Sequence, residues 1–127
     1  MGDNGLTHNV IIALGTNTGH EANLDKAIKL LSRIVGGMKA SRRLWTAPIG
    51  IESDRFMNQV VTGTCSMNLD ELIAAMKRIE AACGRTAEST ARGIVTADID
   101  ILQYDGIKSH RDDWDREYIK TLIKELI

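Results

Sequence analysis

The chain has 127 residues, of which 43% are hydrophobic and 26% are charged, and its formal net charge is −1. These values are typical of a soluble globular protein, and the length predicts one domain over residues 1–127. A near-neutral chain without a run of basic residues lacks the electrostatic signature of nucleic-acid or membrane-surface binding, and no apolar stretch approaches spanning length. We therefore expect small-molecule partners, with no nucleic acid and no membrane; the oligomeric state is not readable from the sequence.

The cysteines and the first residues bear on the compartment. Cys65 and Cys83 are too few and too far apart for a disulfide framework or a zinc site. Residues 1–8 have no basic start followed by an apolar block, so they do not resemble a signal peptide. The sequence therefore predicts a cytoplasmic protein.

The first third of the chain predicts a strand and a helix. Residues 9–15 form a short apolar run that ends in glycine, which indicates a buried strand followed by a turn. A polar loop follows over residues 16–23. From Leu24 to Val35 apolar residues recur at helical spacing, and two glycines at positions 36 and 37 end the predicted helix.

The middle of the chain predicts extended structure on both sides of a loop. Residues 38–46 favour an extended segment, and residues 47–55 form a loop that holds the single proline. Residues 56–65 are rich in Val and Thr, which favours a strand.

The next helix has the clearest boundaries. Asn68 is a preferred N-cap residue, and Glu71, three residues later, completes a capping box. Gly84 lies just beyond the predicted end. An apolar stripe runs along this helix, which therefore covers a core.

The remaining elements complete a recognisable order. Residues 85–95 predict a loop, residues 96–104 a strand and residues 114–127 a terminal helix. The order βαββαβ is that of the ferredoxin-like α+β fold, in which two helices cover one face of an antiparallel sheet. The predicted C-terminal helix comes in addition, and the second face stays open unless another element covers it.

Two aspartates interrupt the last predicted strand, although aspartate is rare in strands. Because side chains alternate between faces, Asp98 and Asp100 point away from the helices, whereas Ile99 and Ile101 point toward them. The two carboxylates are then roughly 7 Å apart, a spacing at which they can hold Mg²⁺. The alternative is ordinary: polar residues are common on the open face of a half-solvated sheet.

Neighbouring segments resemble a known family, the 6-hydroxymethyl-7,8-dihydropterin pyrophosphokinases of the folate pathway. The matching pieces are "IALGTNTGHEANLDKAI", "WTAPIG", "FMNQV", "LIAAMKRIEAACGR" and "RGIVTADIDIL", which cover about residues 9 to 106. Family members have the ferredoxin-like fold and transfer the terminal pyrophosphate of ATP to the hydroxymethyl group of the pterin, releasing AMP. The resemblance therefore implies ATP as a co-substrate.

The resemblance also implies roles for individual residues. Asp98 and Asp100 match the catalytic pair that binds two Mg²⁺ ions between protein and triphosphate. Phe56 and Asn58 match residues that stack on the pterin ring and bind its edge. From the residues alone, Phe56 would be a core aromatic and Asn58 a polar residue at a strand edge. The matching loop that also contacts the pterin contains Thr46, Pro48 and Ile49.

The nucleotide side follows from the same resemblance. Lys77, Glu80 and Arg85 match part of it, although Lys77 replaces a usual glutamine; from the residues alone they form a solvated helix face. His110 and Arg116 keep the spacing of a histidine and an arginine that face phosphate. A histidine beside an "RDD" run is otherwise a surface residue.

The C-terminal part of the site and the departures from the family remain. Tyr118 matches the aromatic residue on the second side of the pterin. Two usual arginines are absent, because Val95 and Ala87 occupy their positions. Arg92 either reaches the phosphates from a shifted position, as a third catalytic residue, or is a solvated loop residue. Trp114 either caps the core or lies over the nucleotide.

Three hypotheses follow. The first is an ATP- and Mg²⁺-dependent pyrophosphokinase, slowed by the absence of two arginines. The second is a relative that binds pterin or nucleotide without turnover. The third is a ferredoxin-like interaction domain without small-molecule chemistry, against which the "WTAPIG" and "FMN" matches argue.

Overall fold

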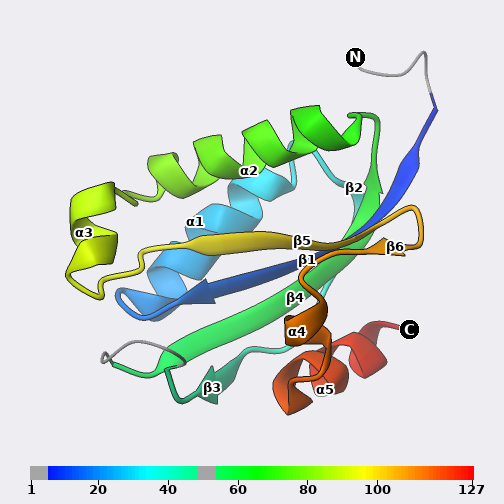
Figure 1. The fold of residues 1–127 in the computed structure, drawn as a ribbon. Coiled ribbons are helices and arrows are strands. Elements are labelled where there is room, and N and C mark those ends of the chain that lie inside the picture. Colours follow the sequence, from blue (N-terminus) through cyan, green and yellow to red (C-terminus); the bar gives the residue numbers. More distant parts are fainter. Residues whose placement is uncertain (1–5, 49–53) are drawn as a thin grey trace.

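The computed structural model describes residues 6–48 and 54–127 (Figure 1). Ile49, which the sequence assigns to the pterin loop, lies outside the described residues. The elements in chain order are β1 (His8–Thr16), α1 (His20–Leu31), β2 (Gly36–Ala40), β3 (Leu44–Thr46), β4 (Phe56–Cys65), α2 (Leu69–Ala82), α3 (Ala87–Ala91), β5 (Asp98–Tyr104), β6 (Ile107–Lys108), α4 (Arg111–Trp114) and α5 (Glu117–Leu126).

The strands form one antiparallel sheet. Its order is β2-β4-β1-β5-β6, and β3 also pairs with β4. β2 pairs with the end of β4 near Cys65, whereas β3 pairs with its beginning at Phe56. The arrangement of β2, β4, β1 and β5 is that of the ferredoxin-like fold, so the predicted α+β class is confirmed.

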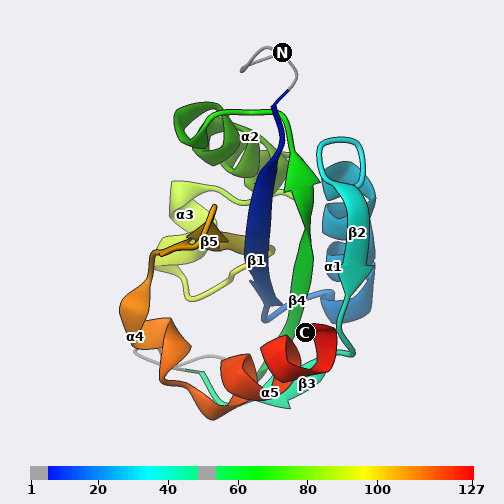
Figure 2. The ribbon, with the colours of Figure 1, turned by 90° about the vertical axis from the view of Figure 1, so that its right-hand side faces the viewer.

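The sheet separates two apolar clusters. α1 and α2 cover one face, and α5 lies against the other (Figures 1 and 2). Along β5, Ile99 and Ile101 belong to the cluster under α1 and α2, as the alternation predicted. The second cluster gathers beneath α5 and contains Ile11, Val60, Leu102, Ile119, Leu122 and Ile123. The face that the sequence left open is therefore partly covered by the terminal helix.

The capping box of α2 is confirmed. The Asn68 side chain accepts from the Glu71 backbone N–H at 2.9 Å, and Glu71 Oε1 accepts from the Asn68 N–H at 3.0 Å. Gly84 follows the C-cap Cys83 with φ of +93°, a conformation that favours glycine. α2 therefore has fixed ends beside β5.

Several boundaries differ from the prediction. α1 begins at His20, before the predicted start at Leu24, because its first turn is largely exposed and has no apolar pattern. It ends at Leu31 rather than at Val35, and the glycines at 36 and 37 lie in β2. β1 covers the predicted residues 9–15 and is one residue longer at each end. The short elements α3, β6 and α4 contain no buried residue, so they leave no hydrophobic pattern to detect.

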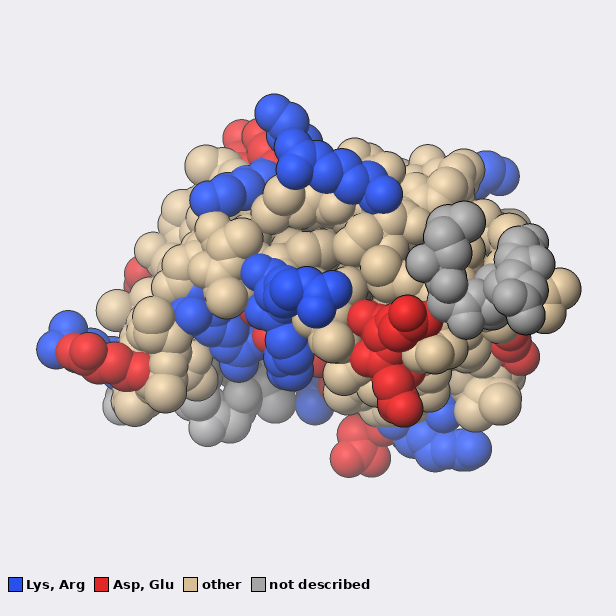
Figure 3. All heavy atoms as spheres, turned by 90° about the horizontal axis from the view of Figure 1, so that it is seen from above, with Lys and Arg blue, Asp and Glu red and all other residues tan. Residues whose placement is uncertain are grey.

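The distribution of charged side chains on the surface and the hydropathy of the helices agree with the near-neutral, 43% hydrophobic composition. On the face in Figure 3, Lys and Arg side chains lie in several separate groups with Asp and Glu groups between them. Among the described residues, no helix combines the length and apolarity needed to cross a membrane.

Candidate functional site

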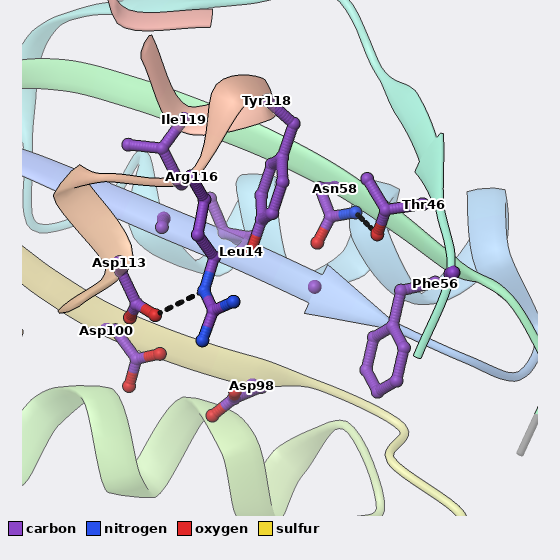
Figure 4. A pocket seen from close by; sticks show the side chains of 13 residues that line it. Leu14, Thr46, Phe56, Asn58, Asp98, Asp100, Asp113, Arg116, Tyr118 and Ile119 are labelled. Atoms are coloured by element: carbon purple, nitrogen blue, oxygen red, sulfur yellow. Dashed lines mark hydrogen bonds and ion pairs between the residues drawn. The ribbon is translucent and has the colours of Figure 1, made fainter. Parts of the chain in front are cut away.

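A pocket of about 200 Å³ opens on the α5 side of the sheet, beyond the apolar cluster beneath that helix (Figure 4). It is built by β1, β3, β4, β5, α4 and α5, which are far apart in the sequence. Its lining contains Ala13, Leu14, Gly15, Thr46, Ala47, Phe56, Asn58, Asp98, Asp100, Asp113, Arg116, Tyr118 and Ile119. Both predicted metal-binding aspartates therefore share one cavity with most of the residues assigned to the pterin.

The strand register forms the floor of this pocket. Gly15 pairs with Asn58 on β4 and with Asp98 on β5, so these three residues lie in one row across the sheet. A Cβ on Gly15 would stand 3.1 Å from Asn58 Oδ1 and 3.6 Å from Phe56 Cδ2. Glycine therefore leaves open the space between the amide and the carboxylate, a role that the sequence did not reveal.

The amide of Asn58 is held in place from one side. Its Nδ2 donates to Thr46 Oγ1 at 2.7 Å and to the Leu44 carbonyl oxygen at 3.4 Å. Asn58 is buried, with 6% of its surface exposed. Because both amide N–H groups are directed to the protein, Oδ1 is the Asn58 atom available to accept from a ligand.

Two aromatic side chains border the same space. Phe56 comes from the beginning of β4 and Tyr118 from the first turn of α5 (Figure 4). Burial raises the pKa of Tyr118, and the Asp113 carboxylate adds to the rise. The phenol is therefore protonated at neutral pH, and it offers a flat ring face together with a hydroxyl donor.

The two aspartates face different side chains. Asp98 Oδ1 accepts from Arg85 Nη1 at 3.0 Å, and Asp100 Oδ1 lies 3.9 Å from His110 Nε2. Burial, together with the smaller effect of the neighbouring Asp98 carboxylate, raises the pKa of Asp100 to about 6. A divalent cation bound to both carboxylates would offset the cost of burying Asp100 and the repulsion between the two charges. The pair therefore suits Mg²⁺, which prefers oxygen ligands.

Glu80 connects α2 to β5 inside the protein. It is 4% exposed; its Oε2 accepts from the Ile99 N–H at 2.8 Å and from Arg85 Nη1 at 3.1 Å. Its other oxygen pairs with Lys77 Nζ at 3.3 Å, although Lys77 itself is largely exposed. Glu80 thus fixes Arg85 beside Asp98, while direct nucleotide binding by Glu80 and Lys77 stays a prediction.

The turn before α5 adds a carboxylate that the sequence analysis missed. Asp113 Oδ1 accepts from Arg116 Nε at 3.1 Å, and Asp113 lines the pocket. One ligand atom each from Asp100, His110 and Asp113 lies within 4.8 Å of the others. The available signal was the three-residue spacing of His110, Asp113 and Arg116, at which side chains of a helical segment lie on the same side.

Other predicted residues lie elsewhere. Arg92 Nη2 pairs with Glu88 Oε1 at 3.1 Å, where both side chains are mostly exposed, and Arg92 does not line the pocket. Pro48 is half-buried and is also absent from the lining. Their contributions to catalysis and pterin binding stay predictions.

The structure shows what occupies the positions where arginines were expected. Val95 is 6% exposed, and its N–H donates to Asn17 Oδ1 at 2.7 Å. Ala87 begins α3 and is exposed. The Asn17 N–H also donates to the Val95 carbonyl oxygen at 3.0 Å, so the loop before β5 is bound to the residue that follows β1, and no arginine side chain projects from it at position 95.

Trp114 covers the second core. Its Nε1 donates to the carbonyl oxygens of Leu102 and Ser109, both at 3.1 Å, and its ring packs on the cluster beneath α5. Of the two alternatives for this residue, the contacts support the core cap.

A second hollow, of about 260 Å³, lies between α2, β5 and the turn at His110. It is mostly apolar, and Leu69 and Ile73 on its wall are 38% and 44% exposed. Asp100 lines both this hollow and the first pocket, so the two spaces meet at that carboxylate.

Fold and site together define a ferredoxin-like α+β protein with a small-molecule pocket that is acidic at one end and aromatic at the other. The chain belongs to the 7,8-dihydro-6-hydroxymethylpterin-pyrophosphokinase family, whose model matches residues 11–127. The family resemblance noted in the sequence is thus confirmed, and the family model also matches the C-terminal residues beyond position 106.

Individual relatives agree with the family. The chain is 39% identical over 97 residues to the 2-amino-4-hydroxy-6-hydroxymethyldihydropteridine pyrophosphokinase of Bacillus subtilis (strain 168), covering 73% of this chain and 58% of that protein. It is 32% and 30% identical to the mitochondrial folate synthesis bifunctional proteins of Pisum sativum and Arabidopsis thaliana, covering 93% and 94% of this chain. The chain spans about a quarter of each plant protein, 25% and 24% respectively.

Proposed function

We propose that this chain transfers pyrophosphate from ATP to 6-hydroxymethyl-7,8-dihydropterin and releases AMP. The observation that carries the proposal is the single pocket in which Asp98 and Asp100 lie beside Asn58 and two aromatic rings. Family membership adds the reaction class, which the geometry alone does not specify.

The aromatic end suits the pterin. A flat heterocycle fits the space bordered by Phe56 and Tyr118, with its edge against Asn58. Asn58 Oδ1 accepts from ring N–H or amino groups, and the open space above Gly15 admits the ring edge. This orientation directs the hydroxymethyl group toward Asp98 and Asp100.

The apolar hollow suits the base of ATP. Its exposed walls, Leu69 and Ile73, supply a surface that a purine covers, and Lys77 and His110 stand at its rim. The triphosphate then extends from this hollow to the pocket past Asp100, which borders both. Arg116 and Arg85 are the nearby guanidinium groups for its oxygens.

The carboxylates fit Mg²⁺, of which we expect two ions. Asp98 and Asp100 would hold them, and Mg²⁺ usually completes its coordination with water and phosphate oxygens. When bound, these ions neutralise charge on the transferred group and the leaving AMP.

The residues of this chain contribute positioning and charge rather than a nucleophile. Asn58 and the two aromatic rings orient the pterin hydroxyl toward the β-phosphorus. Arg116 offsets negative charge on the phosphate oxygens, and a ring N–H of His110 donates to them. As the hydroxyl oxygen bonds to the β-phosphorus, it releases its proton to solvent. The bond between that phosphorus and the α,β-bridging oxygen breaks, and AMP leaves with that oxygen and its electron pair.

A second candidate function rests on a specific observation. With Val95 buried and Arg92 paired to Glu88, the described residues place no arginine from this loop in the pocket. Each lost charge-assisted contact costs roughly tenfold to hundredfold in binding or rate. A pterin- or nucleotide-binding protein with slow turnover is therefore the alternative.

Product analysis separates the two functions. The protein is incubated with ATP, Mg²⁺ and hydroxymethyl-dihydropterin, and AMP and the pterin product are measured, with controls lacking the pterin or containing EDTA. Equal amounts of AMP and pyrophosphorylated pterin, formed only in the complete mixture, support the kinase. Calorimetric binding of pterin or ATP without AMP supports the binding protein, and no binding refutes both.

The compartment stays a prediction. The cytoplasm was expected from the sequence, whereas the names of two plant relatives include "mitochondrial". Localisation of a tagged protein in its native host distinguishes the two.

A further inference from the structure

The side chain of Arg116 is held by a carboxylate before any ligand binds. Asp113 Oδ1 lies 3.1 Å from Arg116 Nε, and the two side chains are 28% and 33% exposed. Among the described residues, this is the one protein hydrogen bond that the structure gives to the Arg116 guanidinium. Both terminal nitrogens therefore stay available, and Figure 4 shows them directed into the pocket, toward the side that bears Asp98 and Asp100.

The backbone of the same turn reinforces this contact. The Asp113 N–H donates to the His110 carbonyl oxygen at 2.9 Å, and the Arg116 N–H donates to the Asp113 carbonyl oxygen at 3.1 Å. His110, immediately before the turn, has the left-handed conformation with φ of +51°. Asp113 thus anchors both the main chain and the side chain of Arg116.

Asp113 places a negative charge in a pocket that is proposed to bind a negatively charged triphosphate. Three carboxylates line this pocket, and each unpaired one would repel a triphosphate. Asp113 differs from Asp98 and Asp100 in that its partner is an arginine of the same segment, three residues on. A carboxylate neutralised by the group that it orients adds little repulsion and removes rotational freedom from a long side chain.

We propose that Asp113 is a positioning residue for Arg116. By holding Nε, it directs the two terminal nitrogens of the guanidinium toward the phosphate oxygens of the nucleotide, across the pocket from Asp98 and Asp100. An arginine fixed in this way binds phosphate through its fork without first losing conformational freedom. The inference rests on the proposed function only in taking the ligand to be a nucleoside triphosphate.

The test uses binding, so it does not depend on turnover. The Mg²⁺ complex of α,β-methylene ATP, in which the bond to be broken is blocked, is titrated calorimetrically into the full chain. The variants are D113A, D113N, R116A and the double variant D113A/R116A, and the matched control is D112N, which removes a carboxylate from the same turn at an exposed position. The Kd for hydroxymethyl-dihydropterin is measured in parallel.

The expected result is a pattern among the variants. D113A weakens nucleotide binding by roughly tenfold, the size of a lost hydrogen bond to a charged group, and leaves the pterin Kd unchanged. D113N stays within about threefold of the parent, because its amide oxygen still accepts from Nε. In the R116A background, D113A has no further effect, since nothing remains for it to orient. D112N behaves as the parent.

Other patterns overturn the inference. If D113A still weakens binding in the R116A background and raises the Mg²⁺ concentration required, Asp113 acts as a cation ligand. Parental affinity in D113A, or a parent that binds no nucleotide analogue, equally refutes it. If nucleotide affinity depends on Arg116 and is weakened by D113A, but the protein forms no AMP from ATP and pterin, the inference is supported and the proposed kinase is refuted.

Discussion

The two faces of the sheet are built from the same three long strands and serve different purposes. Beneath α1 and α2, alternate residues such as Ile99 and Ile101 form a closed apolar cluster. On the opposite face the residues between them divide: Leu102 packs beneath α5, whereas Asp100 and Asp98 line the pocket. The face beneath α1 and α2 is part of an apolar core, whereas the α5 face is divided between a smaller apolar core and the pocket.

This difference teaches where a substitution should act. On the helix-covered face every side chain contributes contacts, so changes there alter the free energy of unfolding. In the pocket, polar side chains such as Asp98 and Asn58 border a cavity as well as their protein partners, so changes there alter ligand binding or turnover. If a substitution in the core beneath α1 and α2 changed ligand affinity without changing stability, the two faces would not be energetically separate.

The strongest test replaces the pocket carboxylates. D98N and D100N keep the side-chain shape and remove one charge each, so we expect kcat to fall by about a hundredfold or more, from lost cation and phosphate stabilisation. AMP release with ATP, pterin and Mg²⁺ measures the effect. The control is D112N, whose carboxylate is exposed. Parental rates in both aspartate variants would remove the metal assignment.

Replacing a glycine on the face beneath α1 and α2 should change stability alone. A Cβ on Gly63 would stand 2.4 Å from Val35 Cγ1 and 2.7 Å from the Gly36 carbonyl oxygen, so backbone must move. We expect G63A to lower the free energy of unfolding by about 2 kcal/mol, as overpacked cores do, without changing nucleotide affinity. Urea denaturation and calorimetry measure the two quantities.

Its matched control is G36A. The Cβ there meets Thr64 Oγ1 at 3.5 Å, an ordinary contact, and stability should stay near the parental value. A loss of nucleotide affinity in G63A at unchanged stability would contradict the division between the faces.

The sequence predicted the fold well because the fold depends on burial. The alternation around Ile99 and the capping box of Asn68 and Glu71 are local patterns with a single structural solution. The short elements α3, β6 and α4 were not predicted because they contain no buried residue and therefore no apolar pattern.

The site was predictable only where the resemblance supplied the roles. Asp98, Asp100, Asn58 and Phe56 do meet in one pocket, but chain spacing alone does not bring β4 and β5 to either side of β1. Asp113 was missed because its importance comes from a contact with Arg116 across a turn that the sequence did not predict.

The pH dependence of stability sharpens the comparison for one pocket residue. The pKa of Asp100 is raised from 3.8 to about 6, chiefly by burial, so the folded protein binds this proton more tightly than the unfolded chain does. Stability from this group is therefore complete below about pH 4 and is lost as the pH rises through about 6.

D100N removes this loss. Measured without divalent cations, the variant should gain about 1 to 2 kcal/mol over the parent between pH 4 and pH 8, less than the full shift because the side chain is partly solvated. Urea denaturation of both proteins across this range gives the difference, in which the other titrating groups largely cancel. A constant difference would mean that Asp100 is not desolvated.

The smallest expected effect concerns the pocket floor. In G15A the new Cβ stands 3.1 Å from Asn58 Oδ1, so the amide must shift by a few tenths of an ångström away from the position in which it meets the pterin edge. We expect pterin binding to weaken by about fivefold, or about 1 kcal/mol, because one hydrogen bond is distorted rather than lost. Nucleotide affinity should not change, and stability should stay close to that of G36A, the other strand glycine replaced. Fluorescence titration of the pterin measures the effect. A loss of stability as large as that of G63A would place Gly15 with the packed core, and the floor of the pocket would then be part of the scaffold rather than of the site.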